Sequence, residues 1–140
     1  MILQCNYEEI RALRAGARAL LDAPSGGGGA VAAPPWGRAE VEALLPQLDG
    51  DMGFNTLAEL QRVLVAVDAI VVCLRAEMEV LVTTAHPAHE HAVAAYFDFA
   101  HALCVYDRLR HVGERMEAMI EVVTGEPSNE VTARGFVFPD

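Results

Sequence analysis

Three histidines lie close together near the middle of the chain, at His86, His89 and His91. Imidazole nitrogens commonly bind zinc, nickel and other divalent ions, and ligands a few residues apart can share one ion. However, His89 and His91 belong to different faces of the helix expected to begin here, and no cysteine or distant histidine obviously completes a set of four ligands. We therefore interpret this segment as a polar corner and keep a divalent metal site as the alternative.

A carboxylate and an imidazole lie one helical turn apart at Asp98 and His101, within an apolar stretch. Ferritin-like di-iron bundles use a Glu-x-x-His pair on each of two helices and one further Glu from each of two others. This chain has one such pair, and the preceding apolar helix offers Asp68, Glu77 and Glu79 but no histidine. The ligand set is incomplete, so a di-iron centre is not expected.

Isolated charges also lie in the most apolar parts of the two longest expected helices. An unpaired buried charge costs several kcal/mol, so each of these charges should have a partner. If the two helices are antiparallel neighbours, their spacing places Arg75 opposite Asp98 and Asp68 opposite Arg108 or Tyr106. We expect buried cross-helix pairs that fix the register of the helices. The functional alternative is a carboxylate in a pocket, with a shifted pKa.

The elements that would position these groups are two long helices, expected from about Thr56 to Thr84 and from Pro87 to Thr124. Their apolar residues recur at helical spacing. From Val63 to Leu74, and from Ala92 to Tyr106, they are apolar on most faces, which indicates burial on several sides. A short turn between them makes the two helices antiparallel neighbours.

A first helix is expected from about Tyr7 to Asp22, because Asn6 and Glu9 match a capping box and the apolar residues follow helical spacing. Glycine and proline then dominate a flexible linker over about 23–37. A shorter helix should follow from about Arg38 to Leu48.

The tail from Gly135 to Asp140 resembles a short strand that could pair with Ile2–Cys5. The acidic loop 49–55 lacks the glycine and glutamate that a calcium loop requires, so we interpret it as a polar turn before a helix capped by Thr56. The expected fold is a single all-α domain: a bundle of about four helices with two long antiparallel ones and a short β-pair between the chain ends.

Composition excludes several classes of function. The net charge is −10 and all ten basic residues are arginine, which argues against a nucleic-acid binder or docking on anionic lipid. The chemistry of a P-loop, a Schiff base or a kinase needs lysine, which the chain lacks. Ser25 and Ser128 are the only serines, and neither lies in a G-x-S-x-G motif.

The cysteines Cys5, Cys73 and Cys104 are far apart and form no C-x-x-C pair. This pattern, with no visible signal peptide, predicts a reduced cytoplasmic protein. The apolar run from Val63 to Leu74 is too short for a membrane span, which needs about 20 apolar residues.

We predict a non-enzymatic interaction or scaffold protein that acts by association with itself or with a protein partner. The apolar content of 53% is high for a chain of 140 residues, so part of it should be buried against another chain, most simply in a two-fold dimer. No cofactor is expected. The alternative is a small metal-binding or metal-dependent protein that uses the His86–His101 region, and a ligand sensor with a pocket between its helices is a third possibility.

Overall fold

A computed structural model of the protein describes residues 1–23, 34–84, 89–135 and 137. The predicted all-α class is confirmed: two long helices dominate the structure, three shorter helices accompany them, and two short strands form a β-pair. In chain order the elements are β1 (Ile2–Leu3), α1 (Tyr7–Asp22), α2 (Arg38–Leu44), a 3₁₀ turn η1 (Leu45–Gln47), β2 (Met52–Gly53), α3 (Leu57–Thr83), α4 (His89–Thr124) and α5 (Ser128–Ala133).

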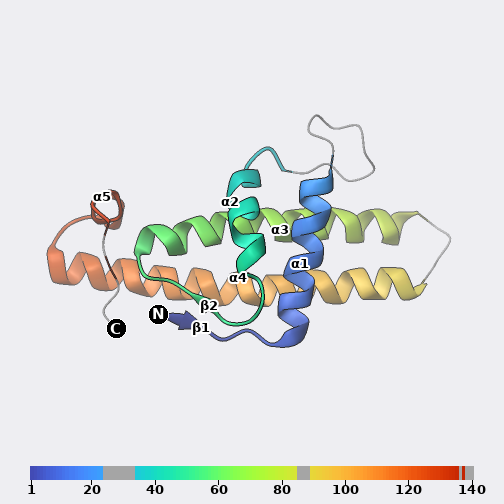
Figure 1. Ribbon diagram of the computed structural model, residues 1–140, viewed down its shortest axis with the longest axis horizontal. Helices are drawn as coiled ribbons and strands as arrows, with labels where there is room; N and C mark the ends of the chain where they lie inside the picture. Colours follow the sequence, from blue (N-terminus) through green and yellow to red (C-terminus); the bar gives the residue numbers. More distant parts are fainter. Residues whose placement is uncertain (24–33, 85–88, 136, 138–140) are drawn as a thin grey trace.

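The two long helices form the base of the molecule. α3 and α4 run antiparallel, side by side, as predicted (Figure 1). α1 crosses both of them on one side, whereas α2 packs mainly on α3. The end of the hairpin nearest residues 84–89 extends past α1, and α5 lies at the opposite end (Figure 1). None of the helices within the described ranges is long and apolar enough to cross a membrane.

α1 begins and packs as its sequence predicts. The Asn6 side chain accepts a hydrogen bond from the backbone N–H of Glu9, and the Glu9 side chain accepts one from the N–H of Asn6, which completes the capping box. At Gly16 the helix touches α3 so closely that a Cβ atom would lie 2.6 Å from Ile70 Cγ2 and 2.9 Å from Leu74 Cγ. The buried apolar residues of α1 include Ile10, Leu13, Ala17 and Leu20.

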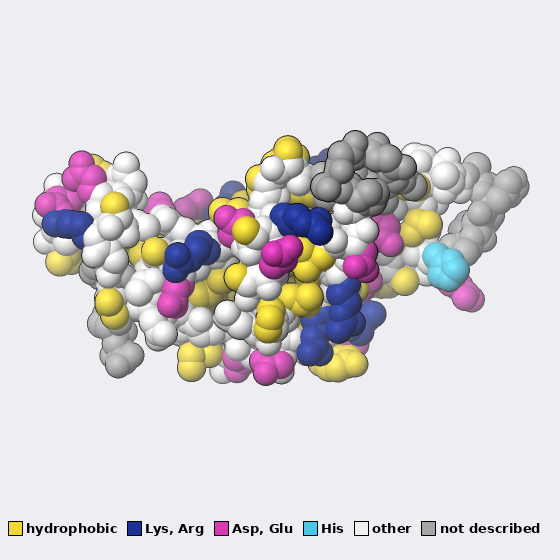
Figure 2. Space-filling model, turned by 45° about the horizontal axis from the view of Figure 1, so that its top comes forward, with side chains coloured by type: hydrophobic (Ala, Val, Ile, Leu, Met, Phe, Trp, Pro, Cys, Tyr) yellow, Lys and Arg dark blue, Asp and Glu magenta, His cyan; other side chains and the backbone are white. Residues whose placement is uncertain are grey.

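The opposite face of α1 is basic. Arg11, Arg14 and Arg18 are exposed along it, and Figure 2 shows a group of basic side chains beside this helix. Their spacing of three and four residues places them on one side of a helix, away from the buried residues. α1 therefore joins an apolar inner face to a basic outer one.

The core is centred on α3. The predicted burial of this helix on several sides is confirmed over most of Val63–Leu74, although Val65 remains 38% exposed. Buried residues of α1, α2 and α4 complete a single cluster with it, so that every long helix contributes. The fully buried side chains on α3 include Leu57, Leu60, Val67 and Ile70, and those on α4 include Ala102, Val105 and Leu109.

The β-pair forms with a different partner from the predicted one. β1 pairs antiparallel with β2, so that Ile2 lies opposite Gly53, because burial of Met52 and Phe54 holds the 52–54 segment against the bundle. From the predicted tail strand, Val137 forms an isolated antiparallel bridge with Thr56, whereas residues 136 and 138–140 lie outside the described ranges.

The remaining boundaries differ little from the predictions. α2 ends at Leu44 and continues as the 3₁₀ turn η1, which contains Pro46, because a proline lacks the N–H that would continue the helix. Thr56 caps α3 as predicted by accepting a hydrogen bond from the Glu59 N–H at 3.0 Å. The Glu59 carboxylate accepts from the Asn55 N–H instead of the Thr56 N–H. Of the predicted linker, residues 24–33 lie outside the described ranges.

Candidate functional site

The most buried polar contact links α1 to α4. Glu9 is the only charged residue that is buried in the described part of the chain. Arg108 donates two hydrogen bonds to its carboxylate, from Nη1 to Oε2 at 2.6 Å and from Nη2 to Oε1 at 2.9 Å. Arg108 Nη2 also donates to the Gln4 carbonyl at 3.0 Å. One guanidinium thus holds the start of α1 and the preceding segment against α4.

The charges of this pair depend on each other. Burial raises the pKa of the Glu9 carboxyl, but the hydrogen bonds from Arg108 and from the Asn6 backbone outweigh it, so the pKa lies below its ordinary value. The hydrogen bond to Glu9 raises the pKa of Arg108. Nearby, burial raises the pKa of the Cys5 thiol despite the opposing charge of Arg108, so Cys5 is not an activated nucleophile.

The predicted cross-helix pairs are replaced by other partners. Asp98 accepts a hydrogen bond from Arg11 Nη2 of α1 at 3.2 Å, and Arg75 pairs with Glu79 one turn along its own helix. The Arg75 side chain is 66% exposed, so it is not buried as expected. α1 lies across both long helices and supplies the partner of Asp98, which a comparison of α3 with α4 alone could not show.

Asp68 and Arg108 are also partnered differently from the prediction. Asp68 Oδ2 accepts a hydrogen bond from the indole Nε1 of Trp36 at 3.3 Å. Arg108 pairs with Glu9 instead, a residue that the sequence indicated only as part of the capping box. His101 Nδ1 lies 2.7 Å from the carbonyl oxygen of Phe97, one turn earlier in α4. These residues position helices, and no nucleophile with an adjacent base is found among them.

The predicted metal ligands are only partly described. His86 and the side chain of His89 lie outside the described residues. His91 is exposed and lines a hollow of about 340 Å³ between α3 and α4, together with Glu77 and Asp98. In the part of the chain that is described, no three His, Cys, Asp or Glu side chains come together as a metal site. The histidine site therefore remains a prediction.

The outer face of α4 is apolar near its start. Val93, Tyr96 and Phe97 are 52%, 55% and 52% exposed. The rings of Tyr96 and Phe97 meet edge to face, with centroids 5.9 Å apart. The sequence indicated apolar residues on most faces of this stretch, from which burial within the bundle was expected. The structure instead leaves one of its faces uncovered.

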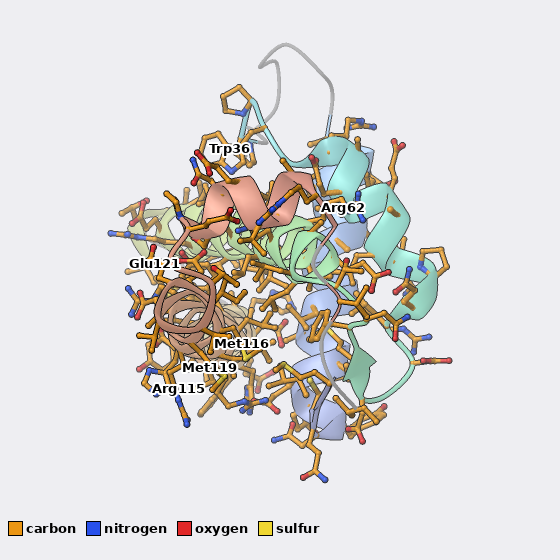
Figure 3. All side chains as sticks on the ribbon, turned by 90° about the vertical axis from the view of Figure 1, so that its left-hand side faces the viewer. Trp36, Arg62, Arg115, Met116, Met119 and Glu121 are labelled. Carbon is orange, nitrogen blue, oxygen red and sulfur yellow. The ribbon has the colours of Figure 1, made fainter. Side chains whose placement is uncertain are left out.

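A second apolar group lies at the other end of α4. Met119, Val122 and Val123 are 57%, 85% and 77% exposed. Figure 3 shows Met119 close to Met116 and Arg115 on one side of the helix, with Glu121 on another side. An exposed arginine, Arg115, lies beside this group, whereas the stretch Val93–Phe97 itself contains no charged residue.

No protein-family model, curated protein or solved structure matches this chain. A function must therefore be argued from the surface that the fold presents. The feature with the clearest chemical meaning is the uncovered apolar face at the start of α4.

Proposed function

We propose that the protein acts by self-association through the outer face of α4, as a non-enzymatic interaction or scaffold protein. The observation that carries this proposal is the exposure of Val93, Tyr96 and Phe97, three large apolar side chains within one and a half turns of the same helix. Apolar patches on soluble surfaces commonly mark interaction sites. Aromatic residues are also enriched at protein interfaces.

The spacing along α4 favours a helical partner. Val93, Phe97, Ala100 and Cys104 follow one another at four, three and four residues, the spacing that keeps side chains on one seam of packed helices. We define these four residues as the α4 seam. Ala100 is small and central, so it would allow two helices to approach closely, while Cys104 is exposed at the end of the seam.

The simplest occupant is a second copy of the chain. Two antiparallel copies of the seam, related by a two-fold axis near Ala100, would place Phe97 of one copy near residue 103 of the other. Such an interface is self-complementary and closes on itself. The charged positions Asp107 and Arg110 follow the seam and would mark its polar rim. We further propose that this dimer forms in the cytoplasm, which suits a chain whose cysteines are free.

Light scattering tests the proposal. At tens of micromolar the wild type should show twice the chain mass of 15.1 kDa. Phe97→Glu should be a monomer, because it places a charge within the apolar contact. Met119→Glu is the matched control, since Met119 is similarly exposed on the same helix, and it should remain a dimer. A wild type that stays monomeric at these concentrations refutes the proposal.

The two-fold axis has a separate test. In a Cys104→Ser background, Ala100→Cys should form a disulfide-linked dimer under mild oxidation, because the two introduced thiols would face each other across the axis. His111→Cys lies about 16 Å further along the helix and should not cross-link, by the rise of 1.5 Å per residue. Equal cross-linking of both variants would indicate random collision.

The alternative function is metal binding at the histidine corner. It rests on three neighbouring histidines, of which His91 lies on the same hollow as Glu77 and Asp98. Metal analysis of tag-free protein after dialysis decides this point. About one zinc or nickel per chain, lost when His86, His89 and His91 are replaced by Gln, would favour the alternative.

A further inference from the structure

A basic hollow lies on the outer face of α1. Its volume is about 470 Å³, within the range of small-ligand sites. Arg11, Arg14 and Arg18 line one side of it, and Asp49 and Gly50 of the turn before β2 also line it. The remaining lining residues are Cys5, Asn6, Tyr7, Ile10 and Ala15.

Two of these arginines form no ion pair with any residue that the structure describes. Arg11 is shared between Glu8 at 3.0 Å and Asp98 at 3.2 Å. Arg14 and Arg18 have no carboxylate oxygen within 4.0 Å in the described ranges. The chain has twenty acidic residues for ten basic ones. Carboxylates of the same chain are therefore plentiful as possible partners for Arg14 and Arg18. Two guanidinium groups are left facing solvent at one concave site.

The spacing of Arg14 and Arg18 suits an anion with two negative groups. Arg14 and Arg18 are one helical turn apart, so their Cα atoms lie about 6 Å from each other along the axis. A guanidinium presents a planar fork of donors that matches a carboxylate or phosphate group. Two linked negative groups can place one in each fork and so make more charge-assisted hydrogen bonds than a single phosphate shared between the two.

The other walls limit what can enter. The hydroxyl of Tyr7, an exposed residue at the start of α1, can donate a further hydrogen bond. Asp49 also lines the hollow, and none of the ion pairs found among the described residues includes it. Its charge opposes an anion that fills the whole space. Ile10 is 6% exposed and offers an apolar floor.

We infer that this hollow binds a small ligand with two linked oxyanion groups, either phosphates or carboxylates, held by Arg14 and Arg18. The residues that carry the inference lie on α1 and not on the α4 seam. It therefore stands or falls independently of self-association.

Isothermal titration calorimetry at low ionic strength tests the inference, with pyrophosphate and citrate as probes. At least one of them should bind, and which one binds identifies the phosphate or the carboxylate source. Arg14→Gln and Arg18→Gln should each weaken binding by about tenfold or more, as expected for a lost charge-assisted hydrogen bond. Arg115→Gln removes an exposed arginine near the far end of α4 (Figure 3) and should leave the affinity unchanged.

Two conservative variants and a check of folding complete the experiment. Arg14→Lys and Arg18→Lys keep the charge but lose the fork, and they should weaken binding less than the glutamine variants do. Circular dichroism checks that each variant is folded, which is expected because both side chains are exposed. The inference is overturned if neither probe binds, if Arg115→Gln weakens binding as much as Arg14→Gln, or if orthophosphate binds as tightly as pyrophosphate. Binding of an oligoglutamate peptide in place of both probes would also overturn it.

Discussion

Replacing Glu9 by Gln should destabilise the fold by about 2 kcal/mol. Breaking a fully buried ion pair costs about 3–5 kcal/mol. Here the Glu9 side chain is 5% exposed and that of Arg108 is 41% exposed. Because water can hydrate the arginine once its partner is lost, we expect roughly half of the cost of breaking a fully buried pair. Glutamine at the third position of the helix can still complete the capping box. Glu9→Ala removes this bond as well and should cost about 1 kcal/mol more.

The reverse substitution, Arg108→Met, should cost more than Glu9→Gln. It leaves a carboxylate 5% exposed without its cation, and we expect a loss of about 3–4 kcal/mol at pH 7. Burial is already the largest single influence on the Glu9 pKa, and without the opposing hydrogen bonds from Arg108 we expect it to raise that pKa above its ordinary value. The carboxylate can then escape the penalty by taking up a proton.

The wild type and Arg108→Met should therefore differ in how their stability depends on pH. In the wild type the folded-state pKa of Glu9 lies below its ordinary value of 4.5. Its contribution is present in full above that value and is lost as the pH falls through the folded-state pKa. In Arg108→Met the folded-state pKa is raised, so the destabilisation is largest at neutral pH and shrinks as the pH falls toward 4.5.

Urea denaturation followed by circular dichroism at one fixed protein concentration measures these differences. The set comprises Glu9→Gln, Arg108→Met and their double variant at pH 7 and at pH 4.5. The double variant should be more stable than the sum of the single losses implies, by at least 1 kcal/mol. Additive losses, or a cost of Arg108→Met that grows at lower pH, would refute the reasoning.

Two further predictions concern packing. Gly16→Ala should destabilise the fold by about 1–3 kcal/mol in thermal melts, since its Cβ would meet α3 at 2.6 Å. Gly50→Ala, which has open space around its Cβ position, should change stability by less than about 1 kcal/mol. In dilute native protein a thiol reagent should label exposed Cys104 first and half-buried Cys5 more slowly. Cys73, which is 1% exposed, should react only after unfolding, so early labelling of Cys73 would contradict the described core.

Sequence reasoning succeeded where the signal is local. The capping box of Asn6 and Glu9 places the start of α1 correctly, and Thr56 does the same for α3. Apolar periodicity also gives the two long helices within two residues at each end. These signals depend only on neighbours in the chain, so a single sequence contains them.

Sequence reasoning failed where the partner of a charged residue comes from an element distant in the chain. The pairing of Arg75 with Asp98 assumed that α3 and α4 face only each other, but α1 lies across both and supplies Arg11. Glu9 was not considered as a partner of Arg108, because the capping box already accounted for its carboxylate. The exposure of Phe97 was missed for a similar reason, since apolar residues around a helix do not reveal which of its faces the fold leaves uncovered.

The contacts between α1 and α4 also affect the order of folding and the rate of unfolding. The hydrogen bonds from Arg108 to Glu9 and from Arg11 to Asp98 join residues 99 and 87 positions apart, whereas α3 and α4 are consecutive along the chain. Local contacts form with little loss of chain entropy, so we expect the α3–α4 hairpin to form early and α1 to dock late. Substitutions at Glu9 or Gly16 should then leave the refolding rate nearly unchanged and accelerate unfolding. The docking of α1 would thus govern the lifetime of the folded protein.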